Sequence, residues 1–154
     1  MQGKRFIRTL ASISLALTFC SVIATVPAAA ESSNARCSNR TLRGSYGFTI
    51  DGTIVGPNIP FRGLALQHYD GQGNITQVDH LVTAGVPPAE DWTPGTGTYS
   101  VNPDCTGSAV INSQSEPFPI PLHFVIVNNG NEIHQVVDAN AVVAVGIRVH
   151  QDED

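Results

Sequence analysis

The stretch PLHFVIVNNGNEIHQVVD (121–138) predicts a β-hairpin. Apolar and polar residues alternate on both sides of Asn129-Gly130, a dipeptide typical of a two-residue type I′ turn. This turn sets the register, so one face of the hairpin carries Leu122, Phe124, Ile126, Ile133, Gln135 and Val137. Because alternation decides which face of a strand is buried, we expect this face to line the interior. His123 and His134 then lie diagonally on the outer surface, exposed to solvent and without a third metal ligand nearby in sequence.

Around this hairpin the chain is punctuated by Gly, Pro, Asn and Asp every eight to twelve residues, with β-branched and aromatic runs between them. That spacing is typical of an all-β sandwich or barrel. We expect strands at 44–55, 61–69, 75–84, 96–102, 107–114, 121–128, 131–138 and 141–150. Short connections favour an antiparallel meander, and closing it removes the sheet edges. The prediction is therefore an all-β fold, a small antiparallel up-and-down barrel of about eight strands.

The first thirty residues have the pattern of a cleaved signal peptide. A basic start (Lys4, Arg5 and Arg8) precedes an apolar run from Leu10 to about Val26, and Ala28 and Ala30 fit an A-x-A cleavage site before Glu31. The alternative is an uncleaved anchor, but the run is shorter than the roughly 20 residues that a span needs. Phe19 before Cys20 argues against a lipoprotein signal. We expect a secreted or periplasmic product.

The remaining chain divides into a disordered tail at 31–36, a single barrel domain at 37–150 and an acidic C-terminal tail at 151–154. After residue 30 it contains five arginines, no lysine and thirteen acidic residues, a formal charge of about −8. Such a surface disfavours nucleic acid and, once the signal is removed, anionic membranes. The lack of lysine excludes Schiff-base chemistry. The oligomeric state stays open.

Cys37 and Cys105 are the cysteines that remain after residue 30. In an oxidising compartment two cysteines most simply pair. We therefore expect one disulfide. The alternative, a reactive thiol or metal ligand, lacks a neighbouring histidine in sequence.

The segment 61–84 contains the candidate catalytic residues. A three-residue loop places Leu64, Leu66, His68, Val78, His80 and Val82 on one face, with His80 opposite Leu64; a four-residue loop brings Gln77, Asp79 and Leu81 to that face instead. His80 is then either a satisfied core residue or a general acid/base facing a ligand cavity. Asp51 and Asp79 are the carboxylates expected within strands, where each is either outward-facing or part of such a site.

Two longer connections, 56–60 and 85–95, stand out because long loops at a barrel mouth often carry function. The second contains Trp92, which either contributes to a site or caps the barrel. The sequence contains no nucleophile elbow, zinc motif, phosphate loop or dinucleotide fingerprint. We therefore expect neither a cofactor nor a metal.

The phrases LRGSYGFTIDG (42–52), DGQGN (70–74), GTYSVNPDCTG (97–107) and LHFVIV (122–127) resemble, in the same order, a group of small exported bacterial proteins. These proteins look like eight-stranded calycin-type barrels, similar in shape to the allene oxide cyclase and dirigent barrels. The resemblance covers nearly the whole chain after the signal. It implies a barrel with a signal and a disulfide, and no catalytic residue follows from it.

Three functions are compatible with this sequence. The first is a barrel that binds a small apolar or aromatic molecule in its lumen, lined by Tyr46, Phe48, Leu64, Leu66, His68, Trp92, Tyr99 and Phe124. The second is a cofactor-free cyclase, isomerase or lyase that uses His80 and Asp79. The third is a structural or interaction protein whose barrel is filled by its own side chains.

Overall fold

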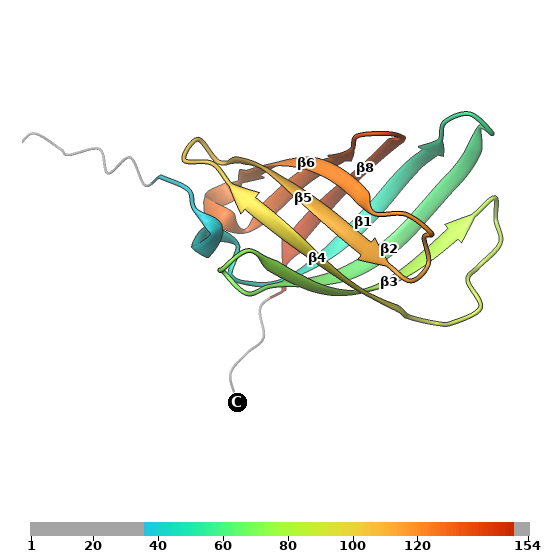
Figure 1. Ribbon diagram of the computed structural model, residues 1–154, viewed down its shortest axis with the longest axis horizontal. Helices are drawn as coiled ribbons and strands as arrows, with labels where there is room; N and C mark the ends of the chain where they lie inside the picture. The colour runs from blue at the N-terminus through green and yellow to red at the C-terminus, as the bar shows by residue number, and fades with distance from the viewer. Residues whose placement is uncertain (1–35, 150–154) are drawn as a thin grey trace, which may run out of the picture. The chain divides into compact units, whose positions relative to one another are not determined.

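The computed structural model describes residues 36–149, which form a closed antiparallel β-barrel of eight strands (Figure 1). Each strand pairs with the next one along the chain, and β8 closes the barrel against β1. The strands are β1 Gly44–Ile54, β2 Ile59–Tyr69, β3 Asn74–Thr83, β4 Thr93–Val101, β5 Thr106–Ser113, β6 Ile120–Val127, β7 Glu132–Val137 and β8 Ala141–Arg148. The predicted all-β up-and-down barrel is confirmed.

Among the strand starts, the largest differences are at β2 and β4, which begin two and three residues before the predicted 61 and 96. Proline is a turn signal in a sequence, which accounts for the later predicted starts. Pro60 and Pro94 are instead each the second residue of a strand. Near a strand start the missing N–H of proline is tolerated.

The hairpin at 121–138 has the predicted register. Leu122 lies opposite Val137, and Phe124 lies opposite Gln135. Both central turn residues have positive φ (Asn129 55°, Gly130 83°), as a type I′ turn requires, and the Asn131 amide donates to the Asn128 carbonyl at 3.1 Å. The predicted inner face is buried, apart from half-buried Val137. His123 and His134 lie on the outer surface, where each contacts a carboxylate at 2.7 Å.

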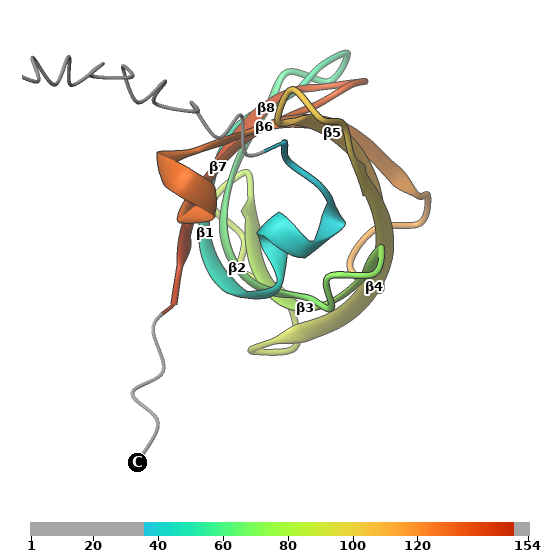
Figure 2. The same ribbon diagram turned by 90° about the vertical axis from the view of Figure 1, so that its left-hand side faces the viewer.

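A short 3₁₀ helix, η1 (Asn39–Leu42), lies within the ring of strands at one end of the barrel (Figure 2). Leu42 is completely buried, and the Asn39 side chain accepts a hydrogen bond of 2.9 Å from the Val101 amide. Arg148 donates to the carbonyls of Arg43 (2.5 Å) and Thr41 (3.0 Å). We call the segment 37–43, which contains η1, the plug. The end of the barrel that holds it, with the turns at 70–73, 102–105 and 128–131, is the plug end, and the half of the lumen next to it is the plug half.

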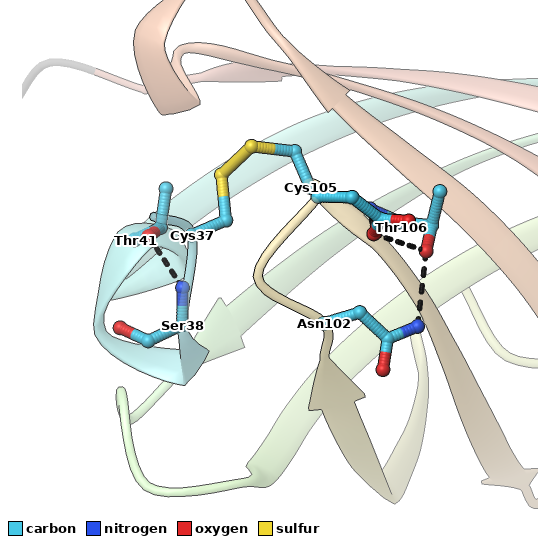
Figure 3. The surroundings of a disulfide bond; sticks show 7 residues. Cys37, Ser38, Thr41, Asn102, Cys105 and Thr106 are labelled. Atoms are coloured by element: carbon cyan, nitrogen blue, oxygen red, sulfur yellow. Dashed lines mark hydrogen bonds between the residues drawn. A yellow bond between two sulfur atoms is a disulfide. The ribbon is translucent and has the colours of Figure 1, made fainter. Parts of the chain in front are cut away.

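Cys37 and Cys105 form the predicted disulfide, which joins the start of the plug to the turn between β4 and β5 (Figure 3). Their Cα atoms lie 5.0 Å apart across a sequence separation of 68. Around it, Asn102 Nδ2 donates to Thr106 Oγ1 at 2.9 Å, and the Ser38 amide donates to Thr41 Oγ1 at 3.0 Å. The bridge therefore fixes the plug to the barrel wall.

The lumen near the plug is filled by aromatic side chains. Tyr69 makes edge-to-face contacts with Tyr46 (ring centroids 5.4 Å apart) and Tyr99 (5.0 Å). Phe48 and Phe124 lie opposite Gly146 and Gly107 on neighbouring strands, where a Cβ atom would overlap each ring. The absent side chains make room for these rings, which fill this half of the lumen.

The expected signal peptide (1–30), all but the last residue of the 31–36 tail, residue 150 and the 151–154 tail lie outside the described residues. Within 36–149, no helix has the length and apolar character needed to cross a membrane.

Candidate ligand-binding cavity

The opposite end of the barrel contains a cavity of about 160 Å³. This open end is formed by the loops after β1, β3, β5 and β7. Its walls are mostly apolar and include Ile50, Ile54, Phe61, Leu81, Ile111, Ile120, Leu122 and Val142. A mostly apolar concavity with few polar groups is the usual form of a small-molecule site.

The polar part of the cavity centres on Asp79, whose side chain is only 1% exposed. Asp79 Oδ2 accepts hydrogen bonds from Gln77 Nε2 (2.8 Å) and Ser113 Oγ (2.6 Å). Asp79 Oδ1 accepts from Ser115 Oγ at 3.2 Å. The carboxylate is thus held from two sides, by β3 and by the end of β5.

The donors form a one-way chain across the barrel. Tyr69 OH donates to Gln67 Oε1 (2.7 Å), and Gln67 Nε2 donates to Gln77 Oε1 (2.8 Å). The Nε2 atom of Gln77 in turn donates to Asp79 Oδ2. The Asp79 carboxyl oxygens accept hydrogen bonds here, so they orient the Gln77 amide, which in turn orients the Gln67 amide. The chain links the tyrosine layer of the plug half to the cavity.

Glu116 adds a second acidic group to the cavity lining. Burial raises the pKa of its carboxyl, and the negative charge of Asp79 raises it further. By contrast, none of the five arginines of 36–149 lines the cavity. Arg62 contacts Asp51 on the outside, and Arg148 lies at the plug. The cavity is therefore electronegative.

Gln135 projects into the cavity from β7 and is 9% exposed. Its Oε1 atom is buried without a hydrogen-bond partner among the described residues. Buried polar groups are nearly always paired, and leaving one unpaired costs about 1–3 kcal/mol. Gln135 Oε1 is therefore an unpaired acceptor of a residue that lines the cavity.

Of the two predicted catalytic residues, Asp79 lies in the cavity and His80 does not. His80 does lie opposite Leu64, as the three-residue loop predicted, but their shared face is the outer one. The His80 Nδ1 atom is 2.7 Å from the Asp91 carbonyl, and its ring lies 6.2 Å from that of Trp92. Placing His80 against a lumen was therefore wrong.

The same correction applies to several predicted ligand-lining residues. Leu64 (51% exposed), Leu66 (44%) and His68 lie on the outer face, and Trp92 is 52% exposed beside His80. The reason is the register with β1: Tyr46 and Phe48 point inward, and their partners Gln67 and Ala65 share that face. Cross-strand partners lie on one side of a sheet, so the leucines must point outward.

Tyr46, Phe48, Tyr99 and Phe124 are inside the barrel as expected, but they fill the plug half and do not line the cavity. Tyr46 OH donates to the Gly130 carbonyl at 2.5 Å, and Tyr99 OH donates to that of Asn39 at 3.0 Å. Burial raises the pKa of Tyr46 to about 12. These aromatics support the plug.

The sequence did not indicate Gln67, Ser113, Ser115 or Glu116 as site residues. It placed Gln77 on the candidate face only in the alternative register with a four-residue loop. The available signal was the β1–β2 register, which puts Gln67 opposite the inward-facing Tyr46. Ser115 and Glu116 sit in the loop after β5, where no alternation exists to indicate a direction.

No family model matches this sequence, and none of the curated proteins matches it. Among solved structures, the chain is similar to a de novo designed fluorescence-activating β-barrel. The sequences are 10% identical, the match covers 73% of this chain and 96% of the designed one, and the TM-score is 0.43.

Proposed function

We propose that this protein binds one small, largely apolar molecule in the cavity at the open end of the barrel. The observation that carries the proposal is the contrast between the two halves of the lumen. Tyrosines and phenylalanines fill the plug half, whereas the other half has a cavity of about 160 Å³ with apolar walls and a few polar groups. The interior of an eight-stranded barrel is just wide enough for its own side chains or for one small ligand.

The volume suggests the size of the ligand. An engineered apolar cavity of about 150 Å³ accommodates benzene. A molecule built around a single ring, or a branched chain of similar bulk, therefore matches the space. Asp79, Glu116 and Gln135 would orient it by hydrogen bonds.

The cavity also weighs against the alternative of a purely structural barrel. A lumen filled by its own side chains would leave no room beyond a few waters. The plug half meets that description and the open half does not.

Ligand-dependent stabilisation tests the proposal. A ligand at 100 times its Kd adds about 2.7 kcal/mol to the free energy of unfolding. Single-ring compounds should therefore raise the melting temperature of the protein. Ala65→Leu, which adds bulk to a cavity-lining residue, should abolish the shift, and Ala141→Leu on the exposed outer face should preserve it. No shift from any compound in a broad apolar library would contradict the proposal.

A second candidate function is a cofactor-free isomerase, cyclase or lyase acting in the same cavity. The observation in its favour is the pair of acids, because burial and the charge of Asp79 raise the pKa of Glu116 towards the range of a general acid. Glu116 would transfer the proton and Asp79 would hold the substrate. This assignment replaces His80, which lies outside. Glu116→Gln would abolish turnover of an uncharged substrate found by ligand screening and leave the binding of that substrate intact.

We further propose that the protein is exported, with cleavage before Glu31 leaving the tail at 31–36, the barrel domain at 37–150 and the acidic tail at 151–154. The Cys37–Cys105 disulfide supports this location, because such bonds persist in oxidising compartments. Mass spectrometry of the exported protein should give the mass of residues 31–154. A protein that retains residues 1–30 would contradict the proposal.

A further inference from the structure

The cavity holds a buried acid with no basic side chain beside it. Asp79 is almost fully buried, and its neighbours in the hydrogen-bond network are the uncharged side chains of Gln77, Ser113 and Ser115. Buried charges in proteins are normally paired or bound to a cation. The described part of the chain supplies no arginine at this site, and the chain has no lysine after residue 30.

We propose that the ligand is a small organic cation, a protonated amine on a single-ring or similarly compact apolar body, with its ammonium group bound by Asp79 and Glu116. This inference rests on the proposed binding function and specifies its ligand class. The positive charge would supply the counter-ion that Asp79 lacks.

The direction of the hydrogen bonds in the chain that ends at Asp79 supports a positively charged ligand. Every donor in it points towards Asp79, and the two serine hydroxyls do the same. Three of the four preferred acceptor positions of a carboxylate are used by these contacts, which leaves capacity for a further donor. An ammonium group consists of donors alone and therefore complements this site.

The side-chain oxygen of Gln135, unpaired among the described residues, supports a hydrogen-bond donor on the ligand independently of Asp79. It lies in β7, away from the β3 and β5 residues that bind Asp79, and its buried Oε1 lacks a partner. A hydrogen-bond donor on a molecule bound in the cavity would satisfy that oxygen. Glu116 lines the same cavity, where burial and then the negative charge of Asp79 raise the pKa of its carboxyl. A cation would relieve their mutual repulsion.

The remaining wall fits the body of such a ligand. Ile50, Phe61, Leu81 and Val142 are apolar, so the ring would be buried while the charged end reaches Asp79. An anionic ligand would meet two like charges and no basic side chain. The cavity therefore selects amines over carboxylates of the same shape.

Three probes of equal bulk test this inference: benzylammonium, benzyl alcohol and benzoate, each titrated into the oxidised protein at pH 7 by calorimetry. We expect benzylammonium to bind with one site per chain, and about tenfold (about 1.4 kcal/mol) more tightly than benzyl alcohol, because only the ammonium group brings a positive charge to the carboxylate. Benzoate should bind more weakly than the alcohol.

Matched variants separate the cavity from the general acidity of the protein. Asp79→Asn should remove the preference for the amine, whereas Asp51→Asn, which removes the same charge on the outer face, should preserve it. Glu116→Gln should reduce the preference and serves as the second variant if Asp79→Asn fails to fold. Melting curves establish that each variant is folded.

Two results overturn the inference. If benzyl alcohol binds at least as tightly as benzylammonium in the wild-type protein, the cation preference is wrong and the binding function stands. If Asp51→Asn lowers the preference as much as Asp79→Asn does, the amine is attracted by surface charge and the site assignment is wrong. Absence of binding by all three probes would instead contradict the proposed function itself.

Discussion

Phe48 on β1 lies opposite Gly146 on β8, and its ring occupies the space that a side chain at position 146 would need. A Cβ atom there would overlap the ring, so the two residues are sterically coupled. Gly146→Ala should therefore destabilise the barrel by about 1–3 kcal/mol through overpacking. Gly47→Ala is the matched control on the same wall, because its Cβ would lie 3.8 Å from Val149 Cγ2, an ordinary contact. Equal unfolding free energies for the two variants in urea would contradict this coupling.

Arg148 holds the plug in place through the carbonyls of Thr41 (3.0 Å) and Gly130 (2.7 Å), while its guanidinium lies 4.7 Å from the Tyr46 ring centroid. Arg148→Met keeps the apolar stem and removes these donors. We expect a loss of about 2–3 kcal/mol and faster hydrogen exchange at the η1 amides. Arg62→Met, whose partner Asp51 is on the outer surface, should change stability by less than about 1 kcal/mol. Unchanged exchange at η1 in Arg148→Met would exclude this role.

Ser113 supports the buried carboxylate from β5, with its hydroxyl 2.6 Å from Asp79 Oδ2. Ser113→Ala leaves that oxygen short of a donor in a buried site. The expected cost is about 1–3 kcal/mol, measured by chemical denaturation. Ser108→Ala, on the exposed face of the same strand, should stay within about 0.5 kcal/mol of the wild type. Indistinguishable variants would show that the network adds nothing to stability.

The disulfide closes a loop with a sequence separation of 68 between Cys37 and Cys105. In the chain-entropy model a bridge of this span contributes about 4 kcal/mol. Replacing both cysteines with serine should lower the free energy of unfolding by about that amount. Reduction of the wild-type protein should produce the same denaturation midpoint as the double variant. A reduced protein as stable as the oxidised one would contradict the expectation.

Acid should destabilise the turn between β2 and β3. Hydrogen bonds from the Asn74 side chain and from the amides of Asn74, Gln72 and Gly73 lower the pKa of Asp70 to about 2. Because the pKa is lower in the folded than in the unfolded state, this contribution is present above about pH 4 and is lost as the pH falls towards 2. The lowered pKa can be checked by NMR titration of the Asp70 carboxyl. Asp70→Asn should show a shallower loss of stability over that range, and an unaltered slope would refute the assignment.

Much of the fold could be predicted from local sequence. The turn residues at 70–74 and 129–130 and the β-rich runs between them determined the number, order and approximate ends of the strands, because short turns restrict successive strands to antiparallel pairing. The two cysteines after residue 30 predicted the disulfide through their number and the expected oxidising compartment. The inner face of the 121–138 hairpin was also predictable, since its apolar alternation and its turn agree.

The candidate site was less predictable, because the neighbouring strands decide which face of β2 and β3 points into the barrel. Alternation alone put Leu64, Leu66 and His80 inside, on the rule that the more apolar face is buried. The structure reverses this, because β2 pairs with β1, whose inward Tyr46 and Phe48 force Gln67 and Ala65 to the same side. The polar side chains then become acceptable inside, since Gln67, Gln77 and Asp79 satisfy one another.

By itself, then, the sequence determined a disulfide-linked antiparallel barrel, through turn chemistry and strand periodicity that act over a few residues. The tertiary structure decided which half of the lumen is filled and which residues face the cavity. It brought Asp79, Glu116 and Gln135 together from three separate parts of the chain and left the charge of Asp79 without a basic partner among the residues described. Which side chains are buried, and which polar groups meet, depends on how the strands close into a barrel, and no local sequence pattern encodes that closure.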